Sequence, residues 1–140
     1  TDLESAFTDT DLLFVCLPLT KETTGLVGLE LLRKLSGGYL VNVARGEIIK
    51  EEDLYIALKD NILAGAGIDV WYNYPSAKNP EPILPSKFPI HELPNVVMSP
   101  HVATHSKKAR DLDKAETLQN LLAFLRTGRP VNVVDLDRAY

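Results

Sequence analysis

Residues 38–44, GYLVNVA, together with Arg45 and Gly46 behind them, decide the fold. The apolar residues of this stretch follow one another instead of alternating with polar ones, a pattern typical of a parallel strand that is covered on both faces. Arg45 then places a permanent charge directly after a strand that belongs to the core. The position of this arginine raises the question of what a guanidinium does at the end of a buried strand.

Three further apolar runs of the same kind predict strands, and they cover residues 11–17 (DLLFVCL), 63–70 (LAGAGIDV) and 95–99 (NVVMS). Apolar residues at helical spacing predict helices over residues 29–35, 51–59 and 104–127. Gly128 and Pro130 end the last of these helices. Alternating strands and helices predict an α/β fold with about four parallel strands, right-handed crossovers and helices on both faces.

Residues 75–94 differ from the rest because they hold six prolines and no regular apolar spacing. We expect a long surface loop there, and loops of that length in compact domains are usually functional. The remaining pattern contains no internal repeat and predicts one domain.

The composition excludes several classes of protein. A net charge of −4 without a basic stripe argues against nucleic acid as a partner. No apolar run approaches the roughly 20 residues that span a bilayer, and the first residues lack the features of a signal peptide. We therefore expect no membrane contact and a cytoplasmic location. The only cysteine, Cys16, lies in an apolar run and is interpreted as a small buried residue, so we expect neither a disulfide nor a metal site.

Polar residues stand where the predicted strands end. Ligands of open parallel sheets bind outside the carboxyl ends of the strands, and Arg45, Asp69 and His101 all lie at such ends. Taken singly, Arg45 could be a surface ion-pair partner and His101 a hydrogen-bonded structural residue. Their common edge favours a binding or catalytic site.

Four motifs carry a resemblance to a known family, and they cover residues 17–28 (LPLTKETTGLVG), 37–58 (GGYLVNVARGEIIKEEDLYIAL), 63–71 (LAGAGIDVW) and 93–103 (LPNVVMSPHVA). Their order and spacing resemble the D-isomer-specific 2-hydroxyacid dehydrogenases over nearly the whole chain. The resemblance implies a partial Rossmann-like sheet, part of an NAD(P)-binding domain. It also implies an oxidoreductase that transfers hydride between a small 2-hydroxy or 2-oxo acid and NAD or NADP.

The resemblance also implies roles for individual residues. Arg45 would pair bidentately with the substrate carboxylate, and His101 would act as the general acid and base. Asp69 would hydrogen-bond the nicotinamide carboxamide. The implied cofactor-binding residues are Leu17, Pro18, Val43, Ala44, Arg45, Asp69 and His101.

Two departures from the family pattern matter. The glycine-rich phosphate loop G-x-G-x-x-G is missing, since only GAG at residues 65–67 resembles it. The chain therefore resembles the C-terminal part of the NAD(P)-binding domain, with residues 128–140 as a tail that returns to a substrate domain, and we expect no tight cofactor binding to the chain alone. Tyr74 stands where the family has a glutamate that supports the catalytic histidine, so we count Tyr74 among the catalytic residues. Glu81 is the alternative support for His101.

Two other interpretations stay open. One is a non-catalytic nucleotide-sensing or scaffold protein on the same fold, and the other is a fragment without a function of its own. Because the chain resembles only the later part of a doubly wound sheet, the predicted strand at residues 11–17 would lack a neighbour on one side, and we expect a homo-oligomer that covers this edge. The identity of the acid and the choice between NAD and NADP are left undecided by these residues.

Overall fold

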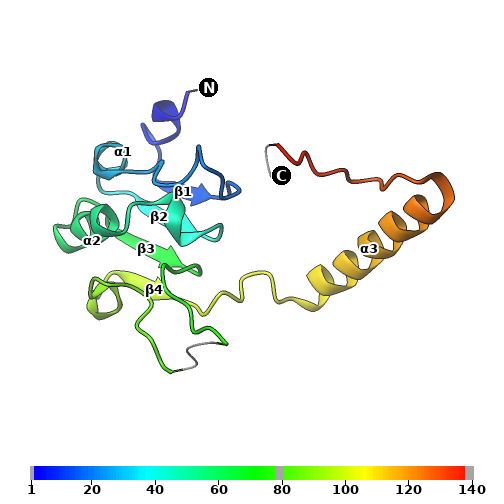
Figure 1. The fold of residues 1–140 in the computed structure, drawn as a ribbon. Coiled ribbons are helices and arrows are strands. Elements are labelled where there is room, and N and C mark those ends of the chain that lie inside the picture. Colours follow the sequence, from blue (N-terminus) through cyan, green and yellow to red (C-terminus); the bar gives the residue numbers. More distant parts are fainter. Residues whose placement is uncertain (1, 78–80, 138–140) are drawn as a thin grey trace. The chain divides into compact units, whose positions relative to one another are not determined.

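The structure is a computed structural model that describes residues 2–77 and 81–137 (Figure 1). The chain divides into two compact units, Thr1–His101 (unit 1) and Val102–Tyr140 (unit 2). Unit 1 contains every strand in the described part of the chain, and unit 2 contains the longest helix.

Unit 1 is built on a four-stranded sheet. Its strands are β1 (Leu12–Val15), β2 (Tyr39–Asn42), β3 (Gly65–Ile68) and β4 (Val96–Met98). All neighbours are parallel, and the spatial order β1-β2-β3-β4 is the order of the strands along the chain. The predicted parallel sheet is therefore confirmed. Each strand is shorter than the apolar run that predicted it, because the ends of the runs leave the ladder and form the loops of the candidate site.

The helices α1 (Leu29–Lys34) and α2 (Glu51–Lys59) confirm two of the predicted helices. Three acidic residues occupy the first turn of α2, where they favour the positive end of the helix dipole. Three short 3₁₀ helices escaped prediction, and they are η1 (Glu4–Ala6), η2 (Gly46–Ile48) and η3 (Ile90–Glu92). A single turn is too short to leave a periodic pattern in the sequence. The last of them interrupts the predicted loop at residues 75–94.

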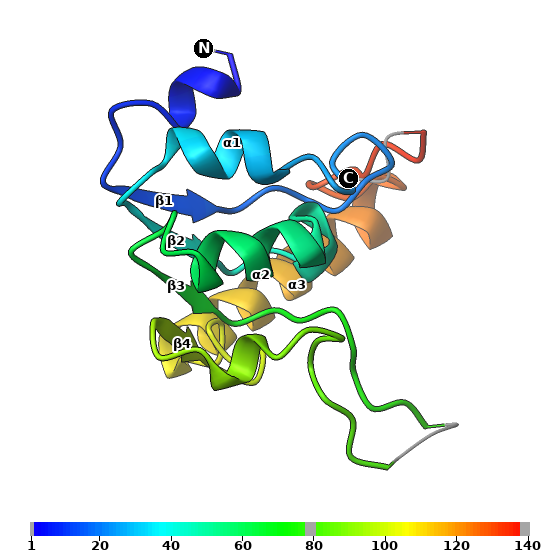
Figure 2. The same cartoon turned by 90° about the vertical axis from the view of Figure 1, so that its left-hand side faces the viewer.

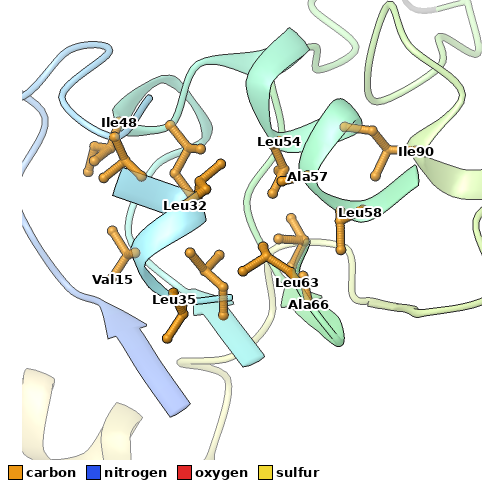
Figure 3. Packing of buried hydrophobic residues seen from close by; sticks show 14 of the residues in the cluster. Val15, Leu32, Leu35, Ile48, Leu54, Ala57, Leu58, Leu63, Ala66 and Ile90 are labelled. Atoms are coloured by element: carbon orange, nitrogen blue, oxygen red, sulfur yellow. The ribbon is translucent and has the colours of Figure 1, made fainter. Parts of the chain in front are cut away.

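The core of unit 1 lies between the sheet and the two helices. Leu32 of α1 and Leu54 and Leu58 of α2 are buried against one face of the strands, as the close view in Figure 3 shows. Residues from each strand and from η3 join the same cluster, among them Val15, Leu40, Ala66, Val96 and Ile90. This single cluster holds the four strands in one layer and thereby sets the position of their carboxyl ends.

The expectation of helices on both faces is wrong for unit 1, where α1 and α2 lie on the same face of the sheet (Figure 2). Right-handed crossovers place successive helices on one face as long as the strand order never reverses, and here it does not. The opposite face carries apolar side chains that are exposed, such as Phe14 at 58% and Val97 at 76%. Cys16 is also exposed, so its interpretation as a buried residue is wrong. It alternates with Val15 and falls on the uncovered side of its strand.

Unit 2 holds α3 (Lys107–Thr127), which confirms the third predicted helix. The Ser106 hydroxyl caps its first turn by accepting a hydrogen bond from the Ala109 amide at 3.0 Å. Gly128 ends the helix with a φ of 73°, a left-handed backbone that glycine adopts without strain. Residues 129–137 form no helix or strand, and the end of the predicted tail, 138–140, lies outside the described residues. No helix in the described part of the chain is long and apolar enough to cross a membrane.

Candidate functional site

Three predicted site residues follow three adjacent strands. Arg45 comes three residues after β2, Asp69 one residue after β3 and His101 three residues after β4. Since β3 lies between β2 and β4 and all three are parallel, their carboxyl ends meet at one edge of the sheet. The predicted placement, with Asp69 between the strands of Arg45 and His101, is confirmed.

A buried asparagine shapes the turn that presents Arg45. The Asn42 side chain is 1% exposed, its Nδ2 donates to the Arg45 carbonyl at 3.0 Å, and its Oδ1 accepts from the Ala44 amide at 3.1 Å. This turn ends the buried strand, so the Arg45 side chain is exposed rather than held in the core. Its Nη1 donates to the Ala44 carbonyl at 2.6 Å, which occupies one of its five N–H donors. One terminal nitrogen of the guanidinium is thus held by the backbone, and four N–H donors remain.

Trp71 connects the segments that follow β2, β3 and β4. A Cβ atom on Gly46 would lie 2.6 Å from the Trp71 carbonyl oxygen, so only glycine permits this approach behind Arg45. The Trp71 indole Nε1 donates to the Ser99 carbonyl at 3.0 Å, and the Trp71 amide donates to the Tyr74 hydroxyl oxygen at 2.8 Å. Trp71, which is 5% exposed, therefore links these segments through its backbone and its indole ring.

Asp69 lies almost completely buried at the centre of this edge, with 5% of its surface exposed. Its Oδ1 accepts a hydrogen bond from the Ser99 hydroxyl, and its amide donates to the Asn42 carbonyl at 3.1 Å. Asp69 is thus held from both sides, its backbone by Asn42 and its carboxylate by Ser99. It can accept a further hydrogen bond from an amide group at the edge, because a carboxylate offers about four lone-pair sites.

His101 is exposed and has a φ of 60°, in the left-handed region that residues with a Cβ rarely adopt. Such backbone conformations persist where the surrounding structure enforces them, and they cluster at functional sites. The His101 ring lies beside the Tyr74 ring, with the ring centroids 5.7 Å apart and the planes tilted by 45°. Between Glu81 and His101, both of which are described, there is no hydrogen bond or ion pair, so the geometry favours Tyr74 as the neighbour of His101.

The four remaining predicted residues lie at the same edge on the β1 and β2 side. Leu17 and Pro18 follow β1 and are exposed, while Val43 and Ala44 follow β2. The loop behind Pro18 is held by Thr23, whose hydroxyl donates to the Pro18 carbonyl at 2.7 Å. Leu17, Pro18 and Val43 are exposed and can face a flat ligand laid along the edge, whereas Ala44 is buried. All seven predicted cofactor-binding residues therefore follow the four strands at one edge.

A pocket of about 420 Å³ opens beside His101, within unit 1. Tyr74 forms part of its wall and also contacts the His101 ring. Its lining residues are Trp71, Asn73, Tyr74, Pro75, Ile83, Pro85, Met98, Ser99 and Pro100. The predicted loop at residues 75–94 thus supplies one side of a cavity at the candidate site.

Sequence reasoning missed three residues that organise this edge, namely Asn42, Trp71 and Ser99. Asn42 left a usable signal, because a polar amide inside the apolar run GYLVNVA must find hydrogen-bond partners when it is buried. The contacts of Trp71 and Ser99 join segments 28 residues apart, and no local pattern reveals them. Among the described residues, no group of three histidine, cysteine, aspartate or glutamate side chains could hold a metal ion.

Comparison with known proteins agrees with this geometry. The family described as D-isomer specific 2-hydroxyacid dehydrogenase, NAD binding domain, matches residues 1–103. The chain belongs to this family. The match includes every residue of the edge described above, from Leu17 to His101.

Individual relatives span a range of activities. The chain is 37% identical to a glyoxylate reductase of Korarchaeum cryptofilum over 95% of its own length and 38% of the relative. It is 36% identical to a glycerate dehydrogenase of Methylorubrum extorquens over 96% of the chain and 41% of the relative. The solved structure of an acyclic imino acid reductase in complex with NADPH and D-Arg is similar with a TM-score of 0.82 and 30% identity, covering 96% of the chain and 40% of that protein.

The chain spans about two fifths of the length of the curated relatives that it matches. A second solved structure, a D-isomer specific 2-hydroxyacid dehydrogenase from Xanthobacter autotrophicus in complex with NADPH and MES, is 31% identical with a TM-score of 0.80 over 99% of the chain. It is likewise longer, since the chain covers 53% of it. Both solved structures are similar to this chain over nearly its whole length.

Proposed function

We propose that this chain carries the catalytic edge of an oxidoreductase that transfers hydride between a small 2-hydroxy acid and NAD or NADP. The observation that supports this best is the order of Arg45, Asp69 and His101 behind three adjacent parallel strands. These are an anion-binding fork, an oriented hydrogen-bond acceptor and a proton-transfer group. Relatives named as glyoxylate reductase and glycerate dehydrogenase catalyse reactions of that class.

Each side chain has a defined task in the proposed reaction. The remaining N–H donors of Arg45 bind the substrate carboxylate through two parallel hydrogen bonds. His101 takes the proton of the 2-hydroxyl group while the hydrogen on C2, the carbon that bears this hydroxyl, leaves as hydride, so that the acid becomes a 2-oxo acid. The bound cofactor supplies the nicotinamide ring that accepts this hydride. Asp69 accepts a hydrogen bond from the carboxamide of that ring and thereby selects which ring face meets the substrate.

Tyr74 acts in this proposal as the neighbour that orients His101. Its hydroxyl oxygen is already fixed by the Trp71 amide, so its ring stays beside the imidazole. A phenol is uncharged near neutral pH and stabilises an imidazolium less than a carboxylate would. We therefore propose that Tyr74 orients the His101 ring without acting as an ion-pair partner for it.

The sharpest test is Arg45→Lys in the complete gene product, assayed for reduction of glyoxylate and hydroxypyruvate with NADH or NADPH. A lysine keeps the charge but cannot reproduce the planar fork, so we expect kcat/KM to fall by about two orders of magnitude or more. Arg110→Lys on α3 is the matched control and should leave the rate unchanged. Wild-type rates in Arg45→Lys would remove Arg45 from the mechanism.

A second candidate function is a non-catalytic nucleotide sensor on the same fold, and the specific observation that favours it is Tyr74 in place of a carboxylate beside His101. One experiment on NADH binding and turnover distinguishes the two functions. A sensor would bind NADH, visible as a change in nicotinamide fluorescence, and would turn over none of the 2-oxo acids. An enzyme would show both binding and turnover.

We further propose that the 140-residue chain alone does not bind NAD or NADP tightly. The sequence lacks the glycine-rich loop whose amides, with a helix N-terminus, hold the pyrophosphate. Hydrogen bonds to the nicotinamide at a net of about 1 kcal/mol each do not offset the several kcal/mol lost when a free ligand is immobilised. Calorimetric titration of the chain with NAD should give no dissociation constant in the micromolar range, and finding one would contradict this part of the proposal.

The proposed partner of the chain is a second copy of itself. Within the described residues β1 pairs with β2 alone, and the exposed Leu12 and Phe14 lie on this edge strand. Unpaired strand edges with apolar side chains are covered by association. Sedimentation velocity at micromolar concentration should detect a dimer or larger species, and Phe14→Lys should shift it toward the monomer. A wild-type chain that stays monomeric under these conditions would rule the association out.

A further inference from the structure

Three hydrogen bonds join Ser99 to the segment that carries Asp69. The Ser99 amide donates to the Ile68 carbonyl at 2.9 Å, and the Ser99 carbonyl accepts from the Trp71 indole Nε1 at 3.0 Å. The Ser99 hydroxyl donates to Oδ1 of the Asp69 carboxylate. The first two bonds fix the Ser99 backbone, and only the third belongs to its side chain. A substitution at Ser99 can therefore remove the contact with Asp69 and leave the backbone bonds in place.

Asp69 depends on this contact because it is 5% exposed, and a buried carboxylate needs hydrogen-bond donors around it. Since the Ser99 hydroxyl donates, Oδ1 acts as an acceptor. A carboxylate offers about four lone-pair sites, so Asp69 keeps capacity for another donor at the edge. The plane of the carboxylate sets the direction of that capacity. Ser99, which directly follows β4, holds this plane.

We propose that Ser99 is a positioning residue that acts through Asp69. Its hydroxyl holds the Asp69 carboxylate in the orientation that accepts a hydrogen bond from the amide nitrogen of the nicotinamide carboxamide. The site thereby prefers a carboxamide to a group without N–H donors. The inference rests on the proposed function, which assigns the carboxamide to Asp69. It adds a residue that supports the site without touching the reacting atoms.

A second serine in unit 1 makes the same kind of contact and provides a matched control. Ser86 is 2% exposed, and its hydroxyl donates to the Glu51 carboxylate at 2.9 Å. Neither Ser86 nor Glu51 takes part in the hydrogen bonds of Ser99. Substitution of either serine by alanine deletes the same atom from a serine–carboxylate pair. A general loss of stability would therefore appear in both variants, whereas an effect on the nicotinamide would appear in one.

The test measures nucleotide binding by calorimetry in the complete gene product, separately from turnover. The two ligands are NAD, or NADP if that form binds more tightly, and the corresponding 3-acetylpyridine dinucleotide, in which a methyl group replaces the amide nitrogen. The wild type should bind the natural nucleotide at least about tenfold more tightly, because a hydrogen bond to a charged group contributes about that factor or more. Ser99→Ala should lower this ratio at least about threefold, and Ser86→Ala should leave it unchanged.

Two further variants show whether Ser99 acts through Asp69. Ser99→Thr keeps the hydroxyl, and the pocket of about 420 Å³ that Ser99 lines leaves room for the added methyl group, so the wild-type ratio should be restored. Asp69→Ala should abolish the preference for the carboxamide. Ser99→Ala added to Asp69→Ala should then change the ratio no further, because two residues that act as one unit are not additive.

The outcomes separate this inference from the proposed function. Turnover of 2-oxo acids with a binding ratio that Ser99→Ala leaves intact, or that Ser86→Ala lowers equally, would overturn the role of Ser99 and leave the proposed function standing. The expected ratios without turnover of any acid would support the role of Ser99 and favour the nucleotide sensor. A wild-type protein that binds both nucleotides equally would overturn the role of Ser99, and one that binds neither would overturn both proposals.

Discussion

The two faces of the sheet in unit 1 differ although both carry apolar residues. On the covered face Leu40 is 0% exposed and packs with the side chains of α1 and α2. On the open face Leu12, from the neighbouring strand, is 48% exposed. Apolar content in a strand therefore does not reveal which side is buried, because the order of the strands decides where the helices lie.

The first prediction tests the difference in burial between the two faces of the sheet. Leu40→Ala should lower the free energy of unfolding by about 2–5 kcal/mol, because it removes a fully buried side chain and leaves a cavity. Leu12→Ala deletes the same atoms from the open face and, at a concentration where the chain is monomeric, should cost less than about 1 kcal/mol. Urea unfolding followed by circular dichroism measures both. Equal losses for the two variants would mean that the open face is covered in solution.

The second prediction concerns the turn at Arg45 and Gly46, at the carboxyl edge of the sheet. Gly46→Ala places a Cβ atom 2.6 Å from the Trp71 carbonyl oxygen, and the backbone behind Arg45 must shift to relieve the overlap. We expect a loss of about 1–3 kcal/mol, the usual cost of overpacking.

Gly67→Ala on β3 is the matched control for Gly46→Ala. Its added Cβ would meet the Val41 side chain at an ordinary contact distance of 3.6 Å, so we expect a change within about 0.5 kcal/mol. Denaturant unfolding of both variants under the same conditions measures the difference in their free energies of unfolding. If Gly46→Ala were as stable as Gly67→Ala, the contact with Trp71 would not position the turn.

Much of the fold could be predicted because its signals are local. Four apolar runs indicated four parallel strands, and the rule for strand ends led to Arg45, Asp69 and His101. The one-sided helices and the exposure of Cys16 could not be predicted, because they depend on the strand order and on what covers each face.

The candidate site was predicted only in part for a similar reason. Its residue types and their order along the chain are written in the motifs, and counting from Asp69 located Tyr74. The bonds of Trp71 to Ser99 and the left-handed backbone of His101 arise from contacts between distant segments. The pocket needs Pro75 and the middle of the same loop, Ile83 and Pro85, to lie near Met98 of β4, and proline content alone does not specify that return.

The smallest expected effect contrasts one tyrosine near the covered core with one on the open face. Burial and the nearby Glu51, Glu47 and Asp53 raise the pKa of Tyr72, whose hydroxyl donates to the Ile49 carbonyl at 3.0 Å. The unfolded chain releases this proton near the ordinary tyrosine pKa of about 10, while the folded chain retains it. The unfolded state thus binds fewer protons above pH 10, so the stabilising contribution is complete below that pH and declines as the pH rises, by at most about 1.4 kcal/mol per pH unit.

Tyr72→Phe should cost about 1 kcal/mol at pH 7 through the lost hydrogen bond and should lose less stability than the wild type between pH 10 and 11. Tyr39→Phe on the open face, where the ring is 55% exposed, should follow the wild-type curve. Urea unfolding at closely spaced pH values measures all three proteins, and parallel alkaline losses in wild type and Tyr72→Phe would contradict the protected proton.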